Sequence, residues 1–146
     1  MSETYTIGLD FGTESVRAVL VETHSGRIAA SASAAYPDSV IDRSLPGLDQ
    51  PLPPDYALQN ASDWVSGMES TVKQVLEMSE VDPHAVVGLG IDFTACTILP
   101  VTAQGEPLAW KPEFRQNKHA WPKLWKHHAA QEQANRVNQL ATRRKE

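Results

Sequence analysis

The chain has 146 residues, of which 41% are hydrophobic and 21% charged, and its net charge is −5. This composition fits an ordinary soluble globular chain, and the single cysteine excludes an internal disulfide. Because the sequence carries neither a signal-peptide pattern nor an apolar run near the roughly 20 residues that a membrane helix needs, we expect a cytoplasmic protein with no membrane contact.

The first third of the chain predicts an antiparallel meander of three strands. Apolar and β-forming residues alternate over Thr4–Asp10, and the pattern resumes over Ser15–Val21 after a break at residues 11–14. These two segments predict a hairpin. A second turn at residues 24–27 contains a glycine, and Ile28–Tyr36 then predicts a third strand.

The middle of the chain predicts a long loop, a helix and a buried strand. Residues 37–55 hold five prolines and four aspartates, which predicts a loop. Apolar residues then recur at helical spacing over Ser62–Met78, with Ser62 as the expected N-cap. Val86–Phe93 is a nearly continuous apolar run, typical of a parallel strand that is buried on both faces.

The last third predicts smaller elements. Ile98–Val101 is a candidate short strand, and the sequence after His119 favours two short helices, one ending near His128 and one over Ala130–Ala141. Charge is uneven along the chain, because residues 1–110 carry 4 basic and 15 acidic side chains whereas residues 111–146 carry 9 and 3. A basic end on an acidic body is compatible with a nucleic-acid arm, a phosphate-binding face or a surface that packs against further protein.

The first hairpin carries the strongest chemical signal. Asp10 ends the first expected strand, and Gly12 in the turn would let the backbone approach an anion. Successive turn amides can bind phosphate oxygens, and the hydroxyls of Thr13 and Ser15 add donors. Asp10 could hold Mg²⁺ through water, since this cation prefers carboxylate and retained water. The pattern indicates a phosphate-binding hairpin.

Three segments in order resemble known sugar kinases. The Asp-x-Gly-Thr hairpin with its Ile-Gly-Leu lead resembles the first phosphate motif of the actin, hexokinase and sugar-kinase superfamily. The segments 88–97 and 123–131 resemble the FGGY carbohydrate kinases, in particular those that act on ribulose, and the likeness covers essentially the whole chain. It implies an α/β fold with a ribonuclease-H-like core, in which a mixed sheet opens with an antiparallel meander and is flanked by helices.

The resemblance also implies an activity. It implies ATP-dependent phosphorylation of L-ribulose or a related ketopentose, with ATP and Mg²⁺ as cofactors. Residues 1–146 would form the N-terminal part of the first, sugar-binding domain, and the ATP-binding domain would lie in the remainder of the kinase chain. Since the family takes its catalytic base from an aspartate beyond residue 146, we expect this chain alone to be inactive. The basic end is then best explained as a surface that packs against the remaining kinase chain, and association between copies stays open.

The same resemblance implies the phosphate-site residues, with Asp10 near the metal. Glu14 departs from the hydroxyl residue that glycerol kinases have there, and a carboxylate facing phosphate would repel it unless a metal intervened. The residues that would cradle the nucleotide phosphates are Gly12, Thr13, Glu14, Ser15 and Arg17.

On the sugar side, Thr94 and Ala95 stand where glycerol kinases have an Arg-Glu pair that binds the polyol. The small residues imply room for a larger sugar, which Ala95 would contact partly through its backbone. Asp92 would either bind a sugar hydroxyl or brace the loop. One of three tryptophans is a further candidate for lining the sugar pocket: Trp110, Trp121 or Trp125.

Two other classes of protein remain as alternatives. In a ribonuclease-H-like nuclease, Asp10 and Asp92 on neighbouring strands would hold two Mg²⁺ ions for attack by water. The acidic balance of residues 1–110 disfavours this, because a nuclease surface should be basic. A non-catalytic module that binds sugar or phosphate is the second alternative. We therefore expect a sugar partner and no nucleic acid.

Overall fold

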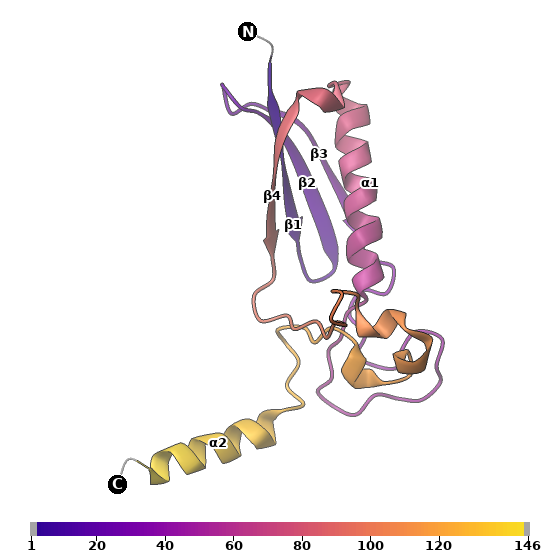
Figure 1. Ribbon diagram of the computed structural model, residues 1–146, viewed down its shortest axis with the longest axis vertical. Helices are drawn as coiled ribbons and strands as arrows, with labels where there is room; N and C mark the ends of the chain where they lie inside the picture. Colours follow the sequence, from indigo (N-terminus) through magenta and orange to yellow (C-terminus); the bar gives the residue numbers. More distant parts are fainter. Residues whose placement is uncertain (1–2, 145–146) are drawn as a thin grey trace. The chain divides into compact units, whose positions relative to one another are not determined.

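The computed structural model describes residues 3–144 of the chain. These residues form two compact units. The first contains the chain up to Val40 together with Asn60–Cys96, and the second contains Ile41–Gln59 together with the chain from Thr97 onward. The whole sheet belongs to the first unit (Figure 1).

The sheet of the first unit has four strands in the order β3-β2-β1-β4. Strands β1 (Tyr5–Phe11), β2 (Ser15–Glu22) and β3 (Ile28–Ala35) form the predicted antiparallel meander. Strand β4 (Val86–Phe93) pairs with β1, and the parallel strand predicted here is confirmed. The mixed sheet and the α/β fold class are thereby confirmed.

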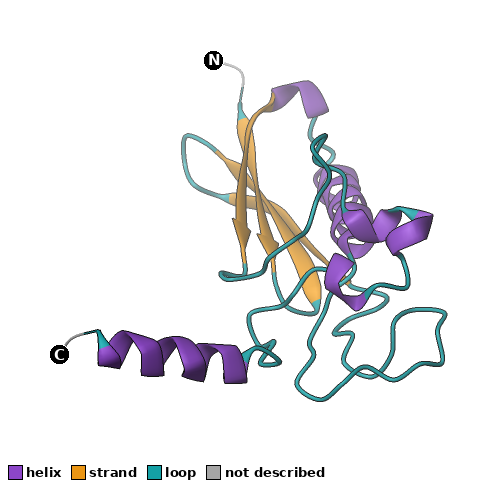
Figure 2. Ribbon diagram, turned by 60° about the horizontal axis from the view of Figure 1, so that its bottom comes forward, coloured by secondary structure: helices purple, strands orange, loops and turns teal. Residues whose placement is uncertain are grey.

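Helix α1 (Ala61–Ser79) lies along one face of this sheet (Figures 1 and 2). The prediction of a helix here is confirmed, but Ser62 is not its N-cap. Asn60 has extended backbone angles, and its side-chain oxygen accepts a hydrogen bond from the Ser62 amide at 3.0 Å. The core lies between helix and sheet. Every second residue of the strands points into it, for example Ile7 and Leu20, and α1 contributes Val75.

The prediction that β4 is buried on both faces is wrong for the described residues. Its apolar side chains at Val87, Leu89, Ile91 and Phe93 are between 53% and 69% exposed. The cause is the position of β4 at the sheet edge, since α1 packs chiefly against β3 and β2. The apolar run correctly predicted a strand. It did not predict how little of that strand is covered by the other described residues.

The second unit has a core of its own, built largely from segments without regular structure. Residues 37–55 contain neither a helix nor a paired strand, as predicted. However, Ile41 and Leu45 within this loop are buried and pack with Leu58, Ala109 and Trp121. Single bridges replace strands here, for example between Ile41 and Leu58.

The rest of the second unit differs from two predictions. Ile98–Val101 forms isolated bridges rather than a strand, and no α-helix ends near His128. Prolines at 107, 112 and 122 divide that region, and it holds only three-residue 3₁₀ turns, at Leu108–Trp110, Pro112–Phe114 and Lys118–Ala120 (Figure 2). Helix α2 (Gln131–Arg143) confirms the last predicted helix, and none of its residues is buried. Within residues 3–144, no helix has the length and apolar character needed to cross a membrane.

The close approach of α1 to the sheet depends on Gly67. A Cβ atom there would lie 2.7 Å from Cγ1 of Val16, a fully buried and β-branched side chain. Alanine is favoured over glycine in a helix by about 1 kcal/mol, but overpacking a core costs about 1–3 kcal/mol. We therefore expect Gly67→Ala to lower the free energy of unfolding by up to about 2 kcal/mol in urea titrations. Glu69→Ala, on the exposed face of α1, is the control, and a stabilised Gly67→Ala would contradict this packing.

Candidate functional site

The turn between β1 and β2 is tight and leaves its backbone accessible. The amide of Gly12 donates a hydrogen bond to the carbonyl of Ser15 at 2.9 Å, and the carbonyl of Glu14 accepts one from the amide of Tyr36 at 2.9 Å. A Cβ atom on Gly12 would lie 3.1 Å from the Ser15 carbonyl oxygen. A residue with a side chain would therefore be crowded at position 12. Because glycine has none, an anion can approach the turn backbone closely.

Asp10 and Arg17 form an ion pair beside this turn. They are direct partners in the antiparallel ladder, and Nη1 of Arg17 donates to Oδ2 of Asp10 at 2.8 Å. Their side chains are 47% and 65% exposed, and pairs this exposed contribute about 0–1 kcal/mol. Such a pair opens at little cost, so the carboxylate can turn to a cation and the guanidinium to a phosphate. The residues thus fit the Mg²⁺ and phosphate that the hairpin pattern predicts.

Tyr36, whose amide bonds to the Glu14 carbonyl of the turn, has a strongly shifted pKa. Burial, then the negative charges of Asp10 and Asp63, raise the pKa of Tyr36 to about 12. The phenol therefore stays neutral at physiological pH and adds no negative charge next to the turn.

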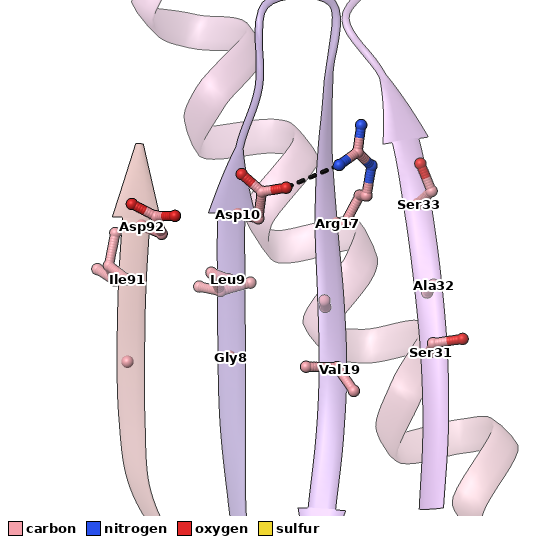
Figure 3. A pocket seen from close by; sticks show the side chains of 12 residues that line it. Gly8, Leu9, Asp10, Arg17, Val19, Ser31, Ala32, Ser33, Ile91 and Asp92 are labelled. Carbon is pink, nitrogen blue, oxygen red and sulfur yellow. Dashed lines mark hydrogen bonds and ion pairs between the residues drawn. The ribbon is translucent and has the colours of Figure 1, made fainter. Parts of the chain in front are cut away.

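Asp92 lies beside Asp10 across the parallel ladder between β1 and β4. Figure 3 shows Asp92, Asp10 and Arg17 in one row across neighbouring strands, with α1 behind the sheet. Oδ1 of Asp92 accepts a hydrogen bond from the Phe93 amide at 2.9 Å, so one carboxylate oxygen braces the start of the loop. This is one of the two roles that the sequence left open.

The loop after β4 begins next to the hairpin. The amide of Thr94 donates to the carbonyl of Phe11 at 3.2 Å, so the start of this loop lies beside the end of β1. Cys96 then has φ = 63°, a left-handed conformation that turns the chain. The first unit therefore brings the predicted phosphate residues and the predicted sugar residues to the same end of its sheet, where β1 and β4 finish.

Sequence reasoning missed part of this surface. The face opposite α1 forms a concavity of about 820 Å³, lined by the predicted acids and by residues such as Gly8, Gly90 and Ser33. Ser33 is the ladder partner of Arg17 and lies beside it in Figure 3. The alternation of serine and alanine along β3 was the available signal. Side chains alternate between the two faces of a strand, so Ser31 and Ser33 share the face opposite to the alanines that pack on the core.

The three candidate tryptophans belong to the second unit and differ in burial. Trp121 is 3% exposed and part of the core, and its Nε1 donates to the carbonyl of Arg115 at 3.0 Å. Trp110 and Trp125 are 46% and 54% exposed. Trp121 is therefore a structural residue, and the other two keep the surface position that a sugar contact needs. No three His, Cys, Asp or Glu side chains of residues 3–144 gather into a metal-binding group.

Comparisons with known proteins place the chain in a family. The model of the FGGY family of carbohydrate kinases, N-terminal domain, matches residues 5–111. The ribulokinase of Geobacillus thermodenitrificans is 51% identical over the whole chain, and that of Anoxybacillus flavithermus is 50% identical. The chain spans 26% of the length of each of these curated relatives.

Solved structures of other sugar kinases share the fold. Gluconate kinase from Lactobacillus acidophilus aligns with a TM-score of 0.70 at 16% identity, over 94% of this chain and 23% of its own. Xylulose kinase from Rhodospirillum rubrum aligns with a TM-score of 0.65 at 15% identity, over 92% of this chain and 23% of its own. At this identity the likeness concerns the fold alone.

Proposed function

The chain belongs to the FGGY family of carbohydrate kinases, and from this premise we propose that it forms the N-terminal part of an ATP-dependent ribulokinase. The proposed reaction transfers the γ-phosphoryl group of ATP to the terminal hydroxyl of L-ribulose and yields L-ribulose 5-phosphate. The chain would supply part of the first, sugar-binding domain of that enzyme.

One contrast carries the choice of substrate. Relatives named ribulokinase are 44% to 51% identical to this chain, whereas the fold-related gluconate and xylulose kinases are 15% to 17% identical. The match spans the whole chain, including the loop after β4, where small residues would admit a ketopentose. This supports ribulose over the other sugars.

The hairpin supplies the phosphate side of the proposed reaction. The turn amides around Gly12 and the hydroxyls of Thr13 and Ser15 would hold phosphate oxygens, and Arg17 would leave Asp10 to contact them. Asp10 would then hold Mg²⁺ through water. Bound there, Mg²⁺ would neutralise charge on the phosphate oxygens during transfer. Fixed donors of this kind lower the barrier because they are already oriented when charge develops.

The loop at Asp92–Ala95 supplies the sugar side. Ala95 would leave room for the ketopentose and contact it through backbone groups, and Asp92, braced by the Phe93 amide, would direct its second oxygen to a sugar hydroxyl. Phosphoryl transfer to an alcohol also needs a carboxylate that accepts the hydroxyl proton. We propose that this base comes from the remaining kinase chain, so the chain alone transfers no phosphoryl group.

A chimera tests the proposal. This chain would replace the matching N-terminal quarter of the Geobacillus thermodenitrificans ribulokinase, and phosphorylation of L-ribulose, D-ribulose, xylulose and glycerol would be measured with ATP. We expect the chimera to prefer L-ribulose and the 146-residue chain to be inactive. A chimera that folds but phosphorylates none of the four substrates would refute the proposal.

The charge of Glu14 gives a smaller, separate prediction. Its carboxylate is exposed in the turn that we assign to the phosphates. Like charges about 4 Å apart repel by roughly 1 kcal/mol in water, so Glu14→Gln in the chimera should lower the KM for ATP up to about 5-fold with little change in kcat. A raised KM would instead mean that Glu14 contacts the nucleotide through the metal.

The nuclease alternative has less support. It needs Asp10 and Asp92 for two metal ions, and the two are ladder partners. However, the acidic balance of residues 1–110 disfavours a nucleic-acid substrate, and the family match is to carbohydrate kinases. A cleavage assay on an RNA–DNA hybrid with the same chain addresses it, since cleavage would favour the nuclease.

A further inference from the structure

Two segments of the second unit are joined by a short ladder of backbone hydrogen bonds. The segments are residues 55–59 and 122–128, and their backbone bonds run from the amide of Gln59 to the carbonyl of Pro122, from Leu124 to Ala57 and from His128 to Asp55, at 3.0 to 3.1 Å. One amide within this ladder has a different acceptor. The amide of Ala57 donates to Nδ1 of His127 at 3.2 Å, so a side chain takes the place of a carbonyl.

This contact fixes the protonation state of His127. A ring nitrogen that accepts a hydrogen bond must carry a lone pair, so the imidazole is neutral and its proton is on Nε2. Ala57 is buried, with 5% of its surface exposed. If Nδ1 gained a proton, the Ala57 amide would face another donor and would lose its acceptor in a place that water reaches poorly.

The surroundings of His127 oppose a positive charge. The ring of Tyr56 meets the imidazole edge to face, with centroids 4.7 Å apart. Lys118 already places its Nζ 5.1 Å from the centroid of that same ring. Burial lowers the pKa of His127 below its usual value of 6.5, and the neighbouring charges lower it further, in the order Lys123, His119 and His128.

The ladder is connected to the chain that follows the sugar-side loop. Lys123 exchanges two backbone hydrogen bonds with Ile98, at 2.9 and 3.0 Å. Ile98 comes three residues after Ala95 in the sequence. Lys123 precedes Leu124 in the ladder. A change in the ladder there would therefore also affect the hydrogen bonds that hold Ile98, just after the sugar-side loop.

We propose that His127 is a pH-sensitive latch that holds residues 55–59 against residues 122–128 while it is neutral and releases them when it is protonated. Its pKa is lower in the folded chain than in the unfolded chain, so the contribution of the latch is complete above pH 6.5. That contribution decreases as the pH falls below 6.5 and is lost below the pKa of the folded state. The inference does not depend on the proposed phosphoryl transfer, and its test needs neither ATP nor sugar.

The test is NMR spectroscopy of the 146-residue chain with ¹⁵N-labelled histidine rings. At pH 7.5 we expect the Nδ1 signal of His127 to be of the unprotonated type, with a coupling across the hydrogen bond to the Ala57 amide. The hydrogen-exchange protection factor of the Ala57 amide should then fall by up to tenfold for each pH unit as the pH drops from 6.5 to the pKa of His127 in the folded chain, because one proton opens the latch, and it should level off below that pKa. The Leu124 amide should lose protection in parallel.

Two variants separate the latch from general acid sensitivity. In His127→Gln a side-chain oxygen can still accept the bond but does not titrate, so Ala57 protection should become independent of pH between 5 and 7.5. In His128→Gln, which changes the exposed neighbour, the pH dependence should persist and move slightly to higher pH, because one of the charges that lower the pKa of His127 is gone. A protonated Nδ1 at pH 7.5, or Ala57 protection that is constant with pH in the unmodified chain, would overturn the proposal without any variant.

Discussion

Gly12→Val should reduce L-ribulose phosphorylation by the chimera at least about 100-fold. The Cβ atom alone would lie 3.1 Å from the Ser15 carbonyl oxygen, and the two methyl groups of valine have to occupy space beside the turn backbone. They would either push the turn open or cover the amides that we assign to the phosphates. Displacing a reacting group by about 1 Å can cost 10²-fold in rate, and either outcome would move the phosphates from their place.

A glycine in the next turn provides a matched control. Gly26 lies between β2 and β3, has φ = 73° and has open space where a Cβ would be. Gly26→Ala should therefore cost about 1 kcal/mol in stability for the left-handed backbone and leave kcat/KM unchanged. If Gly12→Val retained activity within threefold of the unmodified chimera while folding normally, the hairpin would not be the phosphate site.

The first unit was largely predictable because its elements follow local rules. Alternation of apolar residues predicted the three strands of the meander, and helical spacing predicted α1 to within one residue at each end. The hairpin motif needed only the order Asp10, Gly12, Thr13, and the ladder then placed Arg17 opposite Asp10. Burial of β4 was not predictable in this way, since it depends on what packs against the strand rather than on its own residues.

The second unit could not be read from periodicity. Its core joins Ile41 and Leu45, from a proline-rich loop, to Trp121, about 80 residues later in the sequence. No repeat of 2 or 3.6 residues marks such positions, because 3₁₀ turns and single bridges impose none. The His127 contact was hidden for the same reason. Adjacent histidines suggest nothing until the fold brings the Ala57 amide to one of them.

Trp121→Ala should lower the free energy of unfolding by about 3–5 kcal/mol, the usual cost of deleting a large buried aromatic side chain. Trp121 is 3% exposed and packs in the second core with Leu58 and Ala109. Its removal would leave a cavity and would also deprive the Arg115 carbonyl of the donor that it has at 3.0 Å. Denaturant titration measures the loss, and exchange of the Leu58 amide, which bonds to Ile41 at 2.9 Å, reports whether the second core is its source.

Two further tryptophan variants decide whether this loss reflects burial or a sugar contact. Trp121→Phe keeps most of the apolar volume and loses the N–H donor. Its loss of unfolding free energy should therefore be about 2 kcal/mol smaller than that of the alanine variant. Trp110→Ala, at a side chain that is 46% exposed, should change stability by less than about 1 kcal/mol. If Trp121→Ala left stability intact and raised only the KM of the chimera for L-ribulose, Trp121 would line the sugar site and the core described here would be wrong. We expect the opposite, because a side chain with this little exposed surface has almost no area to offer a sugar.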